Sequence, residues 1–303
     1  MIFELDCSII GSDKQKVSKA LCLVAEKKGH LSVEHNVQDW IDNEILNESN
    51  EFLSRFDVQT LKTNQSMWNV TKLHRNYHST IKIGKANGMY SIDQMLNLLT
   101  EKSYLILENG NYDWLAIKHW IELYKNEREF KSLNQQVLRA IKEDIIREAH
   151  AGGGNGTIVN QFNALLTHYH KGCGTYKLTT IFDSDKTSST DIRHNKALKQ
   201  FLANNGFAGH ELYKREIENY FPIEAYEQAG LLFRNQTIPA YTPEEYDFID
   251  IQNATFTNYQ KNQLPRLVPY LTKEALSDRV EHHRHSTSVD EIQKIIILLA
   301  KFI

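Results

Sequence analysis

The sequence predicts an α/β fold: a parallel sheet flanked by helices, with an N-terminal α+β extension and a mainly helical C-terminal part. Short apolar runs alternate with amphipathic stretches in the middle of the chain, as in strands connected by helices. Hydrophobic residues make up 41% and charged residues 24% of the 303 residues, so the chain can bury a core. Changes of texture divide it into residues 1–98, 99–222 and 223–303.

The first region, residues 1–98, opens with a short apolar run from Met1 to Asp6. A helix is expected next, because apolar residues recur at helical spacing between Val17 and Ala25. The stretch from Asp39 to Phe56 predicts a second helix on the same ground. We expect these elements to form the N-terminal extension.

The second region, residues 99–222, supplies the parallel sheet. Four segments are expected to form its strands. They are the apolar run 103–107, a stretch that begins at Ile145 and Ile146 and ends in the glycines 152–154, the β-rich run 177–182, and the short segment 210–214. Amphipathic stretches between them predict helices at 112–124, 157–169 and 192–205. In the third region, residues 288–302 predict a helix, and Asp290 and Glu291 suit the positive charge of its first turn.

Composition excludes several classes of protein. The 35 basic and 38 acidic residues give a net charge of −3, which excludes a uniformly basic nucleic-acid coat but not a local basic groove. The three cysteines form no Cys-x-x-Cys pair, so neither a disulfide framework nor a thiolate zinc site is expected. No signal-peptide pattern opens the chain, and the apolar run Ile295–Ala300 is far too short to span a bilayer. We expect a cytoplasmic protein without membrane contact.

Acidic residues follow two of the predicted strands. Glu108 comes directly after the run 104–107, and Asp183 and Asp185 come directly after the run 178–182. Ligands of parallel sheets bind outside the carboxyl ends of the strands, and carboxylates are the ligands that Mg²⁺ and Mn²⁺ prefer. The alternative is that Asp183 and Asp185 only cap a turn. Two acidic strand ends in one alternating segment favour the metal site.

A glycine run, Gly152-Gly153-Gly154-Asn155-Gly156, lies between a predicted strand and a predicted helix. Its backbone amides could approach a phosphate group. It is neither a Walker A loop nor a dinucleotide fingerprint, because the spacing and the following residues differ. The alternative is a flexible turn between the strand and the helix.

The order of these motifs resembles a TOPRIM domain, the Rossmann-like fold of primases, topoisomerases and several nucleases. The likeness rests on Leu107-Glu108-Asn109-Gly110, the glycine run and Phe182-Asp183-Ser184-Asp185, and covers about 120 of the 303 residues. It implies that Glu108, Asp183 and Asp185 hold one or two Mg²⁺ or Mn²⁺ ions. The usual pattern is Glu-Gly-x-x-Asp; here Asn109 is inserted, which leaves open whether Asp113 joins the site or caps a helix.

The segment Leu212–Pro222 resembles the end of the TOPRIM domain in nucleases of the overcoming-lysogenization-defect (OLD) type. Ile217-Glu218-Asn219-Tyr220 matches a motif whose acid belongs to the active centre, so the resemblance implies that Glu218 is a further metal ligand. A lysine near the site would stabilise the transition-state charge, and Lys186 and Lys214 are nearest in sequence.

The resemblance implies a metal-dependent endonuclease that cleaves DNA or RNA, as a toxic effector of anti-phage defence. Because the chain has no Walker A motif, ATP sensing would come from an ATPase partner. The alternatives are a primase- or topoisomerase-related enzyme, for which the chain has neither the cysteines nor the length, and a non-catalytic TOPRIM interaction module. Whether the chain forms a homo-oligomer stays open.

Residues 58–92 contain no acidic residue. Basic and aromatic side chains interleave there, which is typical of a surface that follows a nucleic-acid backbone. The expected phosphate contacts are Lys72, Arg75, Lys82 and Lys85. A partner-docking surface is the alternative. The histidines of the segment 282–285 have no suitably spaced partner for a zinc site, so their role stays open.

Overall fold

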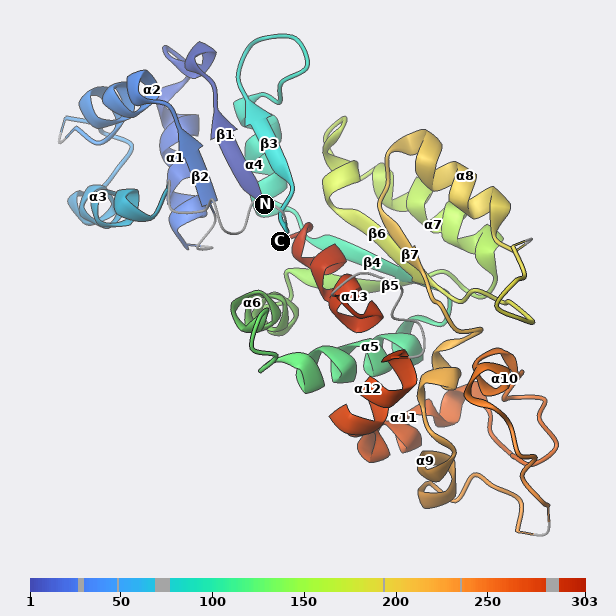
Figure 1. The fold of residues 1–303 in the computed structure, drawn as a ribbon. Helices are drawn as coiled ribbons and strands as arrows, with labels where there is room; N and C mark the ends of the chain where they lie inside the picture. The colour runs from blue at the N-terminus through green and yellow to red at the C-terminus, as the bar shows by residue number, and fades with distance from the viewer. Residues whose placement is uncertain (27–29, 48, 69–76, 193, 235, 282–288) are drawn as a thin grey trace. The chain divides into compact units, whose positions relative to one another are not determined.

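The computed structural model describes residues 1–303 except 27–29, 48, 69–76, 193, 235 and 282–288. It contains two compact units, and each has one all-parallel sheet with flanking helices (Figure 1). The α/β prediction is therefore confirmed, and the N-terminal extension has a parallel sheet of its own. The first unit comprises Met1–Lys102, Thr167–Lys177 and Ala300–Ile303, and the second comprises Ser103–Leu166 and Leu178–Leu299.

The first unit is built on a three-stranded sheet in the order β2-β1-β3. Phe3 of β1 lies between Leu31 of β2 and Ile81 of β3, and all three side chains are buried in one apolar core. Residues of helices α1 and α4 share this core. The strands are β1 (Ile2–Leu5), β2 (His30–Val33) and β3 (Thr80–Ile83); the helices are α1 (Lys14–Glu26), α2 (His35–Trp40), α3 (Arg55–Trp68) and α4 (Ile92–Thr100).

The helix predicted over 39–56 is wrong in its second half. Helix α2 continues through a π-helical turn, Ile41–Ile45, and then stops. Asn50 explains the stop, because its side chain donates to the Ile45 carbonyl at 2.7 Å and accepts from the Phe52 amide at 3.0 Å. An asparagine that binds nearby backbone groups in this way competes with the helical hydrogen bonds.

Cys173 gives a direct test of the first unit's packing. Its side chain is fully buried, and burial raises the pKa of the Cys173 thiol to about 11. The thiolate is the reactive form, so at pH 8 iodoacetamide should modify Cys173 at least about tenfold more slowly than the exposed Cys7. Peptide mass spectrometry measures both rates, and the two should converge in urea. Equal rates in native buffer would contradict the buried position.

The second unit is built on a four-stranded sheet in the order β5-β4-β6-β7. Strand β4 thus lies in the middle, and β5 and β6 lie on either side of it. The chain leaves β4 in one direction and returns past it to β6, so the boundary between β4 and β6 is a topological switch point. The strands are β4 (Ser103–Leu107), β5 (Ile146–His150), β6 (Leu178–Phe182) and β7 (Gly209–Glu211).

Helices cover both faces of this sheet (Figure 1). Helix α5 contacts β4 and β5 and packs beside α6, whereas α7 contacts β4 and β6 and packs beside α8. These helices are α5 (Gly110–Tyr124), α6 (Lys131–Lys142), α7 (Asn155–Leu166) and α8 (Lys196–Asn205). Helix α6 was not predicted, because the alternation of strands and helices leads one to expect a single helix between two strands. Helix α6 is a second helix in the connection between β4 and β5.

The C-terminal part is mostly helical, as predicted. Helices α11 and α12 pack against α5, and the C-terminal part belongs to the second unit up to Leu299. Its helices are α9 (Ile223–Gln228), α10 (Pro243–Phe248), α11 (Leu264–Leu267), α12 (Lys273–Glu281) and α13 (Glu291–Ala300). In the part of the chain that the structure describes, no helix is both long and apolar enough to cross a membrane.

Candidate functional site

Two of the predicted acids follow neighbouring strands at the switch point of the second sheet. Glu108 follows β4, and Asp183 follows β6. These strands are paired in parallel, with Ile106 opposite Thr180, so both acids leave the sheet at its carboxyl-terminal edge. This is the edge at which ligands of such sheets bind.

Lys261 gathers three carboxylates of the second unit around its ammonium group. Its Nζ lies 2.9 Å from Glu218 Oε2, 3.5 Å from Asp183 Oδ2 and 3.7 Å from Asp113 Oδ1. We call Asp113, Asp183, Glu218 and Lys261 the Lys261 cluster. The three acids are between 1% and 6% exposed, which is rare for carboxylates unless a cation compensates them. The cluster therefore behaves as a cation site that an ammonium group fills.

Asp113 has two roles that the sequence left as alternatives. Its Oδ2 accepts a hydrogen bond from the amide of the N-cap residue Asn109 at 3.1 Å, so it closes the first turn of α5 as the acid of a capping box does. Its Oδ1 faces Lys261 and, among the described residues, has no hydrogen-bond partner. Asp113 therefore caps the helix and also belongs to the cluster.

Glu218 is held in place by its neighbours in the segment Ile217-Glu218-Asn219-Tyr220, which forms a 3₁₀ turn. The Ile217 amide donates to Asp183 Oδ1 at 3.2 Å and so joins this turn to the end of β6. The buried Asn219 side chain donates to the Tyr246 carbonyl at 2.9 Å, which ties the turn to α10. Tyr259 completes the site by donating its hydroxyl to Glu218 Oε1 at 2.9 Å. The positions of Glu218 and Asn219 in the motif thus have a structural reason.

Negative charge is in excess in this part of the second unit. Burial raises the pKa of Asp183 well above its usual value and also raises that of Asp113, although Lys261 lowers both. Burial and the nearby Glu218 raise the pKa of Glu216 to about 7. Burial disfavours the Lys261 ammonium, but the carboxylates around it more than offset this and hold its pKa well above the ordinary value. The cluster has three acids and one ammonium, and the neighbouring acids add to the rise in these pKa values, so a further cation would be attracted to it.

Glu108 is bound to the glycine run. Its Oε1 accepts from the Gly154 amide at 2.8 Å, and its carbonyl accepts from the Gly153 amide at 3.3 Å. Gly152, Gly153 and Gly154 all have φ between 80° and 91°, a conformation that disfavours every residue with a Cβ atom. The run therefore wraps around Glu108. The Glu108 carboxylate is close enough to contribute to the raised pKa of Asp113.

Asp185 lies in a turn that the following segment fixes. The amides of Ser184 and Asp185 both donate to the Arg215 carbonyl, at 2.9 and 3.1 Å. The Ser184 hydroxyl donates to the Lys214 carbonyl at 2.7 Å. Asp185 has φ 54°, and its carboxylate makes no hydrogen bond or ion pair with any described residue. It is half-buried next to Asp183 and available to a ligand.

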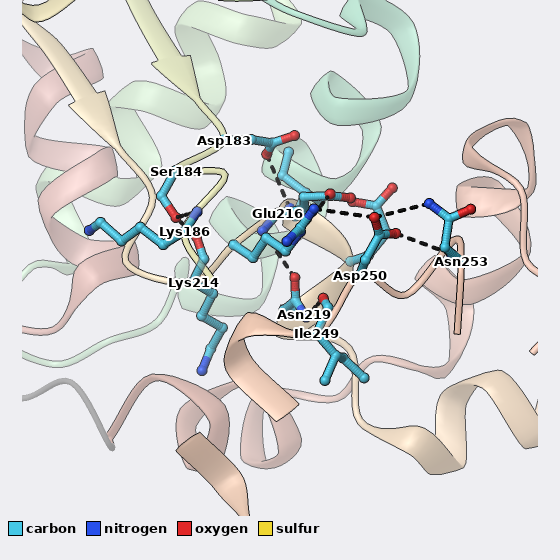
Figure 2. A network of polar contacts seen from close by, with 12 residues as sticks. Asp183, Ser184, Lys186, Lys214, Glu216, Asn219, Ile249, Asp250 and Asn253 are labelled. Atoms are coloured by element: carbon cyan, nitrogen blue, oxygen red, sulfur yellow. Dashed lines mark hydrogen bonds and ion pairs between the residues drawn. The ribbon is translucent and has the colours of Figure 1, made fainter. Parts of the chain in front are cut away.

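The two lysines nearest in sequence do not reach the cluster. Lys214 is fully buried and pairs with Asp247, which also binds Arg279. Lys186 Nζ lies 3.5 Å from Glu211 Oε2. Figure 2 shows both side chains pointing away from Asp183. Lys261 was not predicted from the sequence, because it lies 43 residues beyond Glu218 and outside the motifs that predict the site.

The arrangement of Lys214, Asp247 and Arg279 predicts a stability effect. Burial, together with Arg279, lowers the pKa of Lys214 to about 8 against the opposing effect of Asp247. Asp247→Asn leaves two cations facing each other in the interior and should lower the free energy of unfolding by about 3 kcal/mol. Urea unfolding measures this. Asp250→Asn, in the partly exposed pair with Arg215, is the control and should change it by less than about 1 kcal/mol.

The predicted nucleic-acid contacts are only partly described. Lys82 and Lys85 are exposed residues of the first unit, on β3 and directly after it. Lys72, Arg75 and the histidine segment 282–285 lie outside the described residues. The prediction of a backbone-binding surface therefore stays a prediction.

The carboxylates of the Lys261 cluster are of the ligand type that suits Mg²⁺ or Mn²⁺, but their spacing is that of a site for an ammonium group. Among the described residues, no three His, Cys, Asp or Glu side chains are close enough to hold a metal ion directly. A Mg²⁺–oxygen bond is about 2.1 Å long, so a metal ion would need the carboxylates to draw closer and the ammonium to withdraw. The carboxylate oxygens are nevertheless the ligand type that these ions prefer, and Asp113 Oδ1 has no hydrogen bond to lose.

No protein-family model, curated protein or solved structure matched the chain in these comparisons. The chain is therefore classified by its fold alone, as an α/β protein with parallel sheets flanked by helices.

Proposed function

We propose that the second unit is a divalent-metal-dependent nuclease, which hydrolyses phosphodiester bonds of DNA or RNA. One observation carries the proposal: three buried acids from α5, the end of β6 and the 3₁₀ turn converge on one cation at a switch point. An acid cluster with this excess of charge serves a folded protein poorly unless it binds a cation.

The residues divide into two roles. Asp183, Glu218 and Asp113 would hold the ion, with Glu108 and Asp185 at the same edge of the sheet. The bound ion would supply charge stabilisation and an activated water. Lys261 takes the role of the transition-state lysine, because its ammonium already lies among the carboxylates and can turn toward a phosphate oxygen. Tyr259 keeps Glu218 oriented.

The assignment to a particular class of nuclease rests on the resemblance to TOPRIM nucleases of the OLD type. The order of Glu108, the glycine run, Asp183 and Glu218 supports it, and the contacts of Ile217 and Asn219 give that motif a physical reason. An effector role in anti-phage defence, an ATPase partner and cytoplasmic location are parts of the same proposal.

One assay tests the activity. The purified chain is incubated with labelled plasmid, single-stranded DNA and total RNA, each with Mg²⁺, Mn²⁺ or EDTA. We expect at least one substrate to be cut with a metal and none with EDTA. Cleavage that persists in EDTA would contradict a metal-dependent site. If nothing is cut with either metal, with or without ATPase partners encoded nearby, the non-catalytic interaction module is favoured.

A further inference from the structure

The first unit has a cavity of about 320 Å³ at the carboxyl-terminal edge of its sheet. Gly11 and Ser12 of its wall follow β1, and Gly84 and Lys85 follow β3. Strands β1 and β3 are neighbours, although β2 comes between them in sequence and lies on the other side of β1. The boundary between β1 and β3 is therefore the switch point of this sheet, where α/β folds bind small ligands.

Two lysines line the cavity. Lys85 folds back over the loop that follows β1, because its amide donates to Ser8 Oγ at 2.9 Å and its Nζ to the Ile10 carbonyl at 3.3 Å. Lys16 is paired with Asp93 at 2.7 Å, and the two side chains are 42% and 53% exposed. An ion pair this exposed contributes little stability, so an anionic ligand can replace Asp93.

One acid also lines the cavity, and its carboxylate is already engaged. Asp13 accepts a hydrogen bond from the Lys16 amide at 3.2 Å, in the first turn of α1. The Lys16 and Lys85 ammonium groups are the cationic groups of the wall, and an anionic ligand competes with the Asp93 and Asp13 carboxylates for Lys16.

Two glycines contribute backbone to the wall. A Cβ atom on Gly84 would lie 2.6 Å from Ser8 Oγ and 2.7 Å from Met89 Sδ, so these side chains pack directly against the Gly84 backbone. Gly11 has φ 73° and faces open space, which leaves its backbone accessible to a ligand. Ile9 and Ile92 supply an apolar part of the wall. The volume lies in the range of small-molecule sites, about 300 to 1,000 Å³.

We propose that this cavity binds a phosphate ester of nucleotide size. The phosphate lies between Lys16 and Lys85, and the organic part packs against Ile9 and Ile92. Lysines at a switch point recognise the dianionic phosphate, and the apolar wall accounts for volume beyond that of a free ion. This ligand site is separate from the proposed nuclease activity and does not depend on it.

Calorimetric titration of the full chain in EDTA tests the proposal. EDTA removes divalent metals, so nucleotide binding at the acids of the second unit is suppressed. The probes are AMP, ribose 5-phosphate, inorganic phosphate and adenosine. We expect at least one of the two esters to bind saturably and more tightly than inorganic phosphate, with adenosine weaker than AMP. Absence of binding by both esters would overturn the proposal, and so would inorganic phosphate binding as tightly as they do.

The variants locate the binding. Lys16→Gln combined with Lys85→Gln should weaken ester binding at least about tenfold, a loss of roughly 1.4 kcal/mol. Ser12→Asp, which adds a negative charge to the wall without removing either lysine, should have a similar effect. Lys14→Gln is the matched control, because Lys14 lies in the same turn of α1 but pairs with Glu44 and does not line the cavity.

Unchanged affinity in both the double variant and Ser12→Asp would overturn the assignment. An oligonucleotide that binds through Lys85 and that AMP does not displace would also overturn it, and would return Lys85 to nucleic-acid recognition.

Discussion

Asp183→Asn is expected to reduce metal-dependent cleavage by at least roughly 10²-fold. The substitution keeps the shape of the side chain, and its carbonyl oxygen can still accept from the Ile217 amide. It removes one negative charge from a position that faces Lys261 and lies next to Asp113 and Glu218. Initial rates on the preferred substrate, at saturating Mn²⁺, measure the effect.

The same variant should not lose stability. Clustered like charges repel in the absence of a metal, so the melting temperature of the metal-free protein should stay constant or rise. Asp144→Asn is the matched control, because Asp144 precedes β5 at the opposite edge of the same sheet and makes an exposed ion pair with Arg147. It should cleave at the normal rate. If Asp183→Asn also cleaves at that rate, Asp183 is not part of the active centre.

Lys261→Met is expected to lower both the cleavage rate and the stability of the protein. Without the ammonium, three buried carboxylates lose their shared counter-ion, and the free energy of unfolding at pH 8 should fall by about 3 kcal/mol. Cleavage should fall by roughly 10²-fold, because the transition-state charge loses its lysine. Thermal unfolding at two pH values, together with the cleavage rate, measures both.

The pH dependence of this loss has a definite sign. The pKa values of Asp183 and Asp113 are already raised by burial, and Lys261 lowers them, so its removal raises them further. A carboxyl whose folded pKa is raised favours the folded state at low pH, and this contribution disappears as the pH rises through the folded pKa. The variant should therefore lose more stability at pH 8 than at pH 5.5.

A matched lysine separates this effect from a general loss of positive charge. Lys199→Met removes a lysine from the same unit, where Lys199 makes a partly exposed pair with Glu211. It should change the free energy of unfolding by less than about 1 kcal/mol at both pH values. A Lys261→Met protein that resembles this control in stability and activity would show that Lys261 is an ordinary surface lysine.

The parts of the site that were predicted from the sequence depend on local patterns. Glu108 and Asp183 were found because an apolar run marks a strand, and the residue after it lies at the carboxyl edge of a parallel sheet. Lys261 follows no strand and no motif, and only the packing of the C-terminal helices brings it to the cluster. Its contacts are long-range, and no periodicity encodes them.

Asp113 shows a second limit of prediction from the sequence. Its position in the first turn of a helix fits a cap, and the cap is real. The sequence could not show that the second oxygen of the same carboxylate faces Lys261, because this depends on how α5 packs against the C-terminal helices α11 and α12. A separate parallel sheet in the N-terminal extension was not predicted, for a related reason. Its strands have four residues each and pair across long intervals of sequence.

Mn²⁺ titration by calorimetry tests most directly whether the Lys261 cluster is a divalent-cation site. The wild-type chain should bind Mn²⁺ saturably, and Asp183→Asn should bind it at least about tenfold more weakly, whereas Asp144→Asn should match the wild type. This result would support a metal-dependent active centre at the switch point between β4 and β6. Mn²⁺ binding that is absent in the wild type, or equal in Asp183→Asn, would contradict it.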